Sequence, residues 1–149
     1  MPGLMIIAHA PLASSLKLVA QHAFPECAQS LQALDVMPDM PPDEIERQAR
    51  EMLARVRNPE ALVLTDVFGG TPCNVAQRLA GDPRVKVVVG VNVPMLWRSL
   101  CYSHEPLDAV VTRALSGGAQ GVMQVVSQRP QAQQPRRSAH DQRDPSDQQ

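Results

Sequence analysis

Residues 61–72 read ALVLTDVFGGTP and combine, in succession, an apolar run, a polar turn and the start of a helix. Residues 61–65 are aliphatic except for the final threonine, which indicates a buried β-strand. Gly69 and Gly70 allow a tight turn, Thr71 is a natural helix N-cap, and the proline after it suits the first helical position. The stretch therefore predicts a strand that leads through a short loop into a helix.

The same alternation of apolar runs and segments of helical period extends over most of the chain. Strands are predicted at residues 4–8, 31–36, 61–65, 85–91 and 121–126. Helices are predicted at residues 12–23, 42–57, 72–79, 94–102 and from 107 onward. Continuous aliphatic strands that alternate with helices are typical of a parallel sheet covered on both faces. We therefore predict an α/β fold, a three-layer sandwich with a mainly parallel sheet whose strand order begins 2-1-3-4.

The chain has 149 residues, enough for one domain with a proper core, and 44% of them are hydrophobic, which excludes a disordered or fibrous protein. Residues 128–149 contain no Val, Ile, Leu, Met or Phe. Such a segment cannot bury enough apolar surface to offset its ordering entropy. We therefore expect one domain at residues 1–127 and a disordered polar tail at 128–149. The glycine-rich residues 117–121 are interpreted as a loosened connection before the last strand.

Charge and cysteine content exclude several classes of protein. A net charge of −1 offers no broad field for nucleic acid or anionic lipid. The three cysteines share no CxxC spacing, which argues against a disulfide framework and a structural zinc site. No run approaches the roughly 20 apolar residues that cross a bilayer, and the N-terminus does not resemble a signal peptide. We expect a cytoplasmic protein without membrane insertion, metal or cofactor.

His9 and Asp66 directly follow the first and third predicted strands, which are neighbours where the strand order reverses. A carboxylate that accepts a hydrogen bond from one ring nitrogen would fix the tautomer of His9. The other nitrogen would then keep a free lone pair and could act as a nucleophile or base. Two plainer interpretations remain open: a solvated histidine at a strand end, and an aspartate that caps a turn or the next helix.

Gly69, Gly70 and Thr71 are candidate phosphate-binding residues, because free backbone amides at a helix start bind anions. A histidine nucleophile, a carboxylate that orients it and these amides are the parts needed to accept a phosphoryl group. The segment is not a nucleotide P-loop, since the lysine of that motif is missing. A flavodoxin-like domain that binds a small anionic ligand through His9 and the glycines is the alternative that the same residues allow.

Three segments carry a family resemblance: MIIAH at residues 5–9, DVFGGTPCN at 66–74 and GVNVPML at 90–96. In order and spacing, over residues 3–126, the sequence resembles the enzyme IIA component of the mannose family of the bacterial phosphoenolpyruvate-dependent sugar phosphotransferase system (PTS EIIA type-4 domain). The resemblance implies that His9 is phosphorylated by the phosphohistidine protein HPr and passes the group to an EIIB partner in sugar uptake.

The resemblance also assigns roles to the neighbouring residues. It implies that Asp66 orients the imidazole and that Gly70 and Thr71 contact the phosphoryl oxygens. It further implies a homodimer that exchanges its last strand, here residues 121–126. The residues expected near the docking surface for partners are Val67, Phe68, Asn92 and Trp97.

Two further functions fit this resemblance. In a regulatory protein without sugar transport, the charge of phosphorylated His9 would change which protein binds at this edge of the sheet. Alternatively, the chain would be a phosphocarrier for a dihydroxyacetone kinase, although the Gly-Gly-Thr-Pro segment favours the sugar system.

Overall fold

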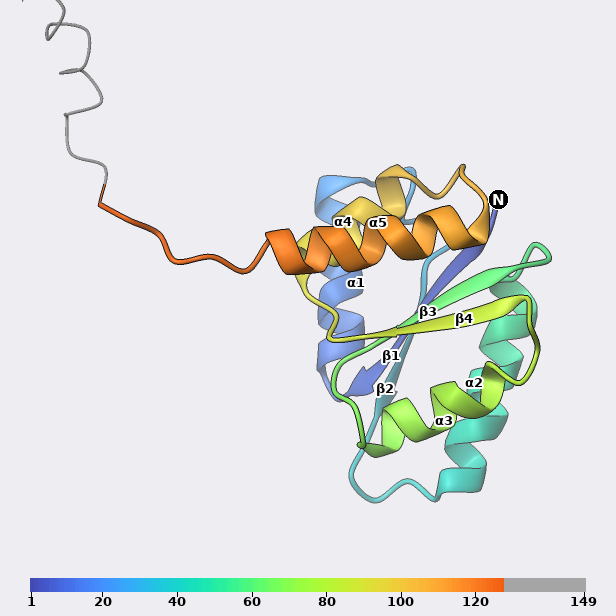
Figure 1. Cartoon of the computed structure of the whole chain (residues 1–149). Coiled ribbons are helices and arrows are strands. Elements are labelled where there is room, and N and C mark those ends of the chain that lie inside the picture. The colour runs from blue at the N-terminus through green and yellow to red at the C-terminus, as the bar shows by residue number, and fades with distance from the viewer. Residues whose placement is uncertain (128–149) are drawn as a thin grey trace, which may run out of the picture.

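The computed structural model describes residues 1–127 (Figure 1), and the predicted polar tail at 128–149 lies outside the described residues. Strands and helices alternate along the described part of the chain until two helices follow one another at its end, as the sequence predicts. Their bounds are β1 (Gly3–His9), α1 (Leu12–Ala23), β2 (Gln32–Val36), α2 (Pro42–Val56), β3 (Ala61–Thr65), α3 (Thr71–Leu79), β4 (Val85–Val89), α4 (Val93–Cys101) and α5 (Leu107–Gln120).

The four strands form one parallel sheet of order β2-β1-β3-β4, which confirms the predicted α/β fold and strand order. β1 and β3 are the two central strands, and Ile7 of β1 is in register with Thr65 of β3. On its other side β1 pairs with β2, so that His9 is in register with Val36. The carboxyl end of β1 therefore lies between the ends of β2 and β3.

Side chains of alternate strand residues point to opposite faces of the sheet and create two apolar layers. Leu4 and Ile6 of β1 pack on one side with α1, α4 and α5, whereas Met5 and Ile7 pack on the other side with α2 and α3. Figure 1 shows these two groups of helices on opposite faces. The predicted three-layer sandwich is thus the observed architecture.

Gly117 and Gly118 lie inside α5, so their interpretation as a loosened connection is wrong. A Cβ atom added at Gly117 would lie 2.8 Å from Cβ of Arg98, and one at Gly118 would lie 2.7 Å from Cε of Met95. Both neighbours belong to α4. The glycines therefore serve close packing of α5 on α4, which outweighs their low helix propensity.

The predicted last strand at residues 121–126 is also wrong for the single chain, since these residues form neither a strand nor a helix. A strand needs a neighbouring backbone with which to pair, and this segment runs away from the domain (Figure 1). Its apolar side chains are consequently exposed: Val122, Met123, Val125 and Val126. Within residues 1–127, no helix is long and apolar enough to cross a membrane.

Candidate functional site

His9 and Asp66 meet at the carboxyl edge of the sheet because their strands are neighbours. The Oδ2 atom of Asp66 accepts a hydrogen bond from the backbone N–H of His9 at 3.0 Å. The same oxygen lies 2.8 Å from Nδ1 of the His9 ring. The side chain of His9 is 52% exposed and that of Asp66 only 14%. The aspartate therefore binds the histidine from the buried side, and much of the ring is exposed to solvent.

The second carboxylate oxygen of Asp66 caps the turn that follows β3. Its Oδ1 atom accepts from the backbone N–H of Val67 at 2.9 Å and lies 3.5 Å from the hydroxyl of Thr65. Burial acts to raise the pKa of Asp66, but the hydrogen bonds from the backbone and ring of His9 outweigh it and lower that pKa below its ordinary value. The turn-capping and ring-orienting interpretations of Asp66 are therefore compatible.

The ionised carboxylate determines which nitrogen of His9 carries the proton. Asp66 can only accept, so the neutral imidazole is protonated at Nδ1. The Nε2 atom then has a free lone pair. An exposed, oriented imidazole with its lone pair directed away from the carboxylate is suited to nucleophilic attack.

The start of α3 lies against the free edge of the His9 ring. A Cβ atom added at Gly70 would lie 3.0 Å from Cε1 and 3.5 Å from Nε2 of His9. Gly69 adopts a φ of +91°, a conformation that favours glycine, and so allows the chain to turn into the helix. Gly70 is the N-cap and Thr71 the first helical residue, so the prediction of Thr71 as N-cap is wrong by one position.

The N-terminus of α3 is open, because no side chain caps it and its first turn contains no acidic residue. The backbone N–H groups there have no partner within the helix, and the helix dipole adds partial positive charge. An anion carried on Nε2 of His9 would therefore meet favourable charge at Gly70 and Thr71.

A hollow of about 270 Å³ adjoins His9 on the side of β2. Besides His9 and Thr71 it is lined by Val36, Met37, Pro38, Met40 and Ile45. The loop that follows β2 was not among the predicted site residues. Its position was the available signal, since this loop also leaves the carboxyl edge of the sheet.

The residues expected near a docking surface fall into two groups. Val67 and Phe68 are 50% and 73% exposed and lie in the loop between Asp66 and α3. Asn92 instead has a structural role, because its Oδ1 caps α4 by accepting from the N–H of Met95 and its Nδ2 donates to the carbonyl of Gly118. A partner contact by Asn92 stays a prediction.

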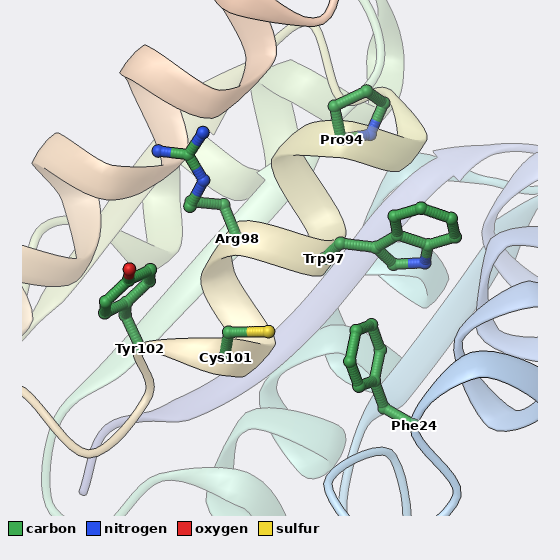
Figure 2. Close-up of a pocket in the computed structure, with 6 residues that line it drawn as sticks. All are labelled: Phe24, Pro94, Trp97, Arg98, Cys101 and Tyr102. Atoms are coloured by element: carbon green, nitrogen blue, oxygen red, sulfur yellow. The ribbon is translucent and has the colours of Figure 1, made fainter.

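Trp97 lies on α4 and packs edge-to-face against Phe24, with ring centroids 6.0 Å apart. Figure 2 shows the two side chains next to one another. They border a separate hollow of about 400 Å³. This hollow is lined by Phe24, Pro94, Trp97, Arg98, Cys101 and Tyr102. Trp97 is not among the residues that line the hollow at His9, and a partner contact by Trp97 stays a prediction.

Among residues 1–127, no group of three or more His, Cys, Asp or Glu side chains is arranged to hold a metal ion. The site as described consists of His9, its carboxylate partner Asp66, the open start of α3 and the adjoining hollow.

Comparison with known proteins adds to this geometry. The EIIA-man family model, described as "PTS system fructose IIA component", matches residues 3–115. The "PTS system mannose-specific EIIAB component" of Escherichia coli (strain K12) is 38% identical over 64 residues, which are 41% of this chain and 20% of that protein. The matched segment thus spans only a fifth of that relative.

Solved structures resemble the whole domain. The "Mannose/sorbose specific IIA subunit of phosphotransferase system" from Enterococcus faecalis has a TM-score of 0.79 and 25% sequence identity, covering 85% of this chain and 96% of that chain. The phosphotransferase system component EIIA from Streptococcus agalactiae has a TM-score of 0.74 and 23% identity, covering 83% of this chain and 97% of that one. At this identity the second similarity shows the fold alone.

Proposed function

Because the chain belongs to the EIIA-man family of phosphotransferase-system components, whose role is phosphoryl transfer, we propose that it is a phosphocarrier that accepts a phosphoryl group on His9. The donor is phospho-HPr and the acceptor is an EIIB protein. We also propose that the chain is located in the cytoplasm. The sugar itself need not touch this chain, since only the phosphoryl group passes through it.

The observation that carries the proposal is the orientation of the His9 ring between Asp66 and α3. Nδ1 lies 2.8 Å from the carboxylate, and the Nε2 edge faces Gly70 at the open helix start. The ring is thus presented with one nitrogen bound and the other available. Phosphoryl transfer needs such in-line positioning together with stabilisation of the charge on the phosphoryl oxygens.

The phosphoryl transfer requires no loss of a proton from His9. The Nε2 lone pair attacks phosphorus, and the N–P bond of the donor histidine breaks with its electron pair returning to the donor ring. Nδ1 keeps its proton and its hydrogen bond to Asp66. The carboxylate offsets the positive charge that the ring gains on phosphorylation, and the amides at Gly70 and Thr71 face the new phosphoryl oxygens.

The surroundings of His9 favour a protein partner over a small anionic ligand. No lysine or arginine is among the residues lining the hollow beside His9, whereas free phosphate esters are usually held by such side chains. The neighbouring Met37, Val67 and Phe68 are exposed apolar side chains, which are typical of protein-binding surfaces. This favours transfer between proteins over binding of a free metabolite.

The proposed state of the protein is a homodimer built through residues 121–126. Their exposed valines and methionine would be a liability in a monomer, and the outer edge of β4 is unpaired by any described strand. In the dimer, this segment of one copy pairs with β4 of the second copy, which satisfies both backbones and covers the apolar side chains.

The proposed function is tested by intact-protein mass spectrometry at neutral to alkaline pH. The chain is incubated with phosphoenolpyruvate, enzyme I and HPr of the same organism, with parallel reactions that lack HPr. We expect an HPr-dependent, acid-labile gain of one phosphoryl group, which is lost when an EIIB protein of the mannose family is added.

Two variants sharpen this experiment. His9→Ala is expected to abolish the gain, and His104→Ala, which changes an exposed histidine in the turn after α4, is expected to leave it intact. A phosphoryl gain that survives in His9→Ala would overturn the assignment of the site. Phosphorylation of His9 without transfer to any EIIB protein would favour the regulatory function instead.

A further inference from the structure

Asp35 of β2 binds the N-terminus of α1 across the sheet edge. Its Oδ1 atom accepts from the backbone N–H of Ser14 at 3.0 Å, and its Oδ2 atom accepts from the Ser14 hydroxyl at 2.6 Å. The two residues are 21 positions apart in the chain. Both oxygens of the carboxylate are therefore used to hold one residue of the helix that follows His9.

The need for this contact follows from the sequence at the start of α1. The N-cap is Pro11, whose side chain cannot accept a hydrogen bond, and the first turn of α1 contains no acidic residue. Ser14 is the third helical residue, which is the residue that an N-cap side chain ordinarily binds. Asp35 thus supplies from a neighbouring strand the cap that the local sequence lacks.

The chain between His9 and α1 is consequently fastened to β2 at two points. The backbone N–H of Ala10 donates to the carbonyl of Val36 at 3.0 Å, and Asp35 holds Ser14 four residues later. Asp66, directly after β3, holds His9 from the opposite side. The histidine therefore lies between two aspartates, one in β2 that fixes the backbone after His9 and one after β3 that fixes its ring.

We propose that Asp35 is a positioning residue for His9: by capping α1 it fixes residues 10–14 and so keeps the imidazole edge aimed at the start of α3. This inference rests on the proposed phosphoryl transfer at His9. Asp35 does not touch the ring, and it acts through the backbone.

The role of Asp35 is to accept hydrogen bonds from α1. Loss of Asp35 leaves the backbone N–H and the hydroxyl of Ser14 without this acceptor. Residues 10–14 are then held less firmly, and the His9 ring is less well oriented toward the start of α3.

The test compares Asp35→Ala and Asp35→Asn in the full chain with phospho-HPr as the phosphoryl donor. Asp35→Ala is expected to lower the maximal rate of His9 phosphorylation about ten- to a hundredfold, since a misplacement of about 1 Å costs roughly 10²-fold. The half-saturating HPr concentration should stay unchanged. Asp35→Asn should restore most of the rate, because its amide oxygen still accepts from the Ser14 N–H.

Asp108→Ala is the matched control, since it removes an aspartate from the first turn of α5, a helix that packs mainly on α4, β3 and β4. It should leave the rate unchanged. Equal rates in the wild type and Asp35→Ala would overturn the proposal. So would a slow Asp35→Asn variant, since that would assign the effect to the charge and not to the cap.

A second readout does not depend on phosphoryl transfer. Nitrogen-15 NMR of the His9 ring reports the fraction protonated at Nδ1, which we expect to fall in Asp35→Ala and to recover in Asp35→Asn. An unchanged tautomer in Asp35→Ala would contradict positioning. If phospho-HPr fails to phosphorylate the wild type, the proposed function fails, and the NMR comparison still decides the role of Asp35.

Discussion

A single carboxylate oxygen of Asp66 accepts from both the backbone N–H and the ring Nδ1 of His9, at 3.0 and 2.8 Å. The end of β1 and the ring of His9 are therefore bound to the same atom, on the residue that directly follows β3. This double contact fixes the side-chain orientation more firmly than a ring contact alone would, because the backbone that carries the ring is held as well.

Asp66→Ala is expected to slow phosphorylation of His9 by about 10²-fold, the cost of a misplacement of about 1 Å in the reacting geometry. The variant leaves Nδ1 without its acceptor, so the ring samples other orientations and tautomers. Asp66→Asn should be intermediate, since one amide oxygen can still accept from His9. The rates are measured by quenched-flow phosphorylation from phospho-HPr, with circular dichroism to establish that each variant is folded. An unchanged rate in Asp66→Ala would reduce Asp66 to a turn-capping residue.

The ionisation of Asp66 is expected to depend on His9. The pKa of Asp66 is lowered in the folded chain, so its charge stabilises the fold at pH values above the unfolded pKa of about 4. This contribution is lost as the pH falls through the folded pKa. Carbon-13 NMR of the Asp66 carboxyl should give a midpoint below that of an ordinary aspartate. His9→Ala should raise the midpoint, because the ring donor is lost while the backbone N–H groups of residue 9 and Val67 remain. A midpoint that does not move would mean that the ring contributes nothing.

The fold was predictable where local pattern and tertiary packing agree. Residues 61–65 are buried on both faces of the sheet, so an unbroken aliphatic run was a sufficient signal. His9 and Asp66 were found together because a parallel sheet brings the residues after neighbouring strands to one edge. Neither inference needed the rest of the molecule.

Other features depend on contacts that no local pattern records. Gly118 has a low helix propensity, and only its contact with Met95 of α4 explains why a glycine lies inside this helix. The cap that Asp35 gives Ser14 joins two segments that are not adjacent in sequence, and nothing in the residues near Pro11 points to it. Residues 121–126 have the composition of a strand, but pairing requires a second backbone beside them.

Gly117→Ala tests the packing of α5 on α4 through the sign of the change in the free energy of unfolding. Helix propensity alone predicts that alanine stabilises the fold by about 0.5–1 kcal/mol. The structure predicts the opposite, because the new Cβ would lie 2.8 Å from Cβ of Arg98. We expect the free energy of unfolding to fall by about 1–3 kcal/mol, as for other overpacked cores. Chemical denaturation measures it, with Ser116→Ala as the control on the same helix, and a stabilised Gly117→Ala would show that α5 can move away from α4.

Val125→Asp tests the proposed homodimer. A charge within the exposed apolar segment should prevent that segment from being buried against a second copy. We expect the wild type to elute as a dimer and Val125→Asp as a folded monomer in size-exclusion chromatography with light scattering. Lys86→Asp, which changes an exposed residue of β4 itself, should weaken the dimer less, because its side chain is not part of the apolar segment. A monomeric wild type at micromolar concentration would contradict the proposal.

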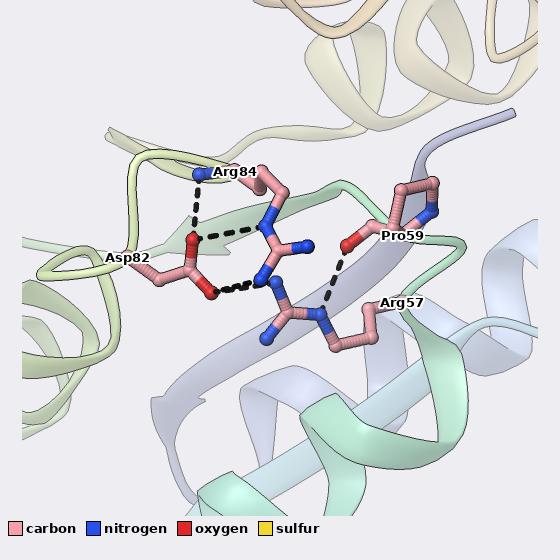
Figure 3. A network of polar contacts seen from close by, with 4 residues as sticks. All are labelled: Arg57, Pro59, Asp82 and Arg84. Atoms are coloured by element: carbon pink, nitrogen blue, oxygen red, sulfur yellow. Dashed lines mark hydrogen bonds and ion pairs between the residues drawn. The ribbon is translucent and has the colours of Figure 1, made fainter.

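Asp82 is expected to make the stability of the fold depend on acid pH. Its carboxylate accepts from the backbone N–H of Arg84 at 2.9 Å and contacts the guanidinium groups of Arg57 and Arg84 at 2.7 and 3.3 Å, joining the end of α2 to the start of β4 (Figure 3). The Arg84 amide and the two guanidinium groups hold the pKa of Asp82 far below its ordinary value. The charge of Asp82 therefore stabilises the folded chain at pH values above the unfolded pKa of about 4, and this stabilisation is lost progressively as the pH falls further.

Asp82→Asn should lower Tm at pH 7, and the difference in Tm from the wild type should shrink as the pH falls from about 4 toward 2. Asp39→Asn, at an exposed aspartate of the loop after β2, should leave Tm nearly constant at both ends of this range. A constant difference between the wild type and Asp82→Asn over this range would mean that the geometry of the turn, and not the charge of Asp82, stabilises this end of the sheet.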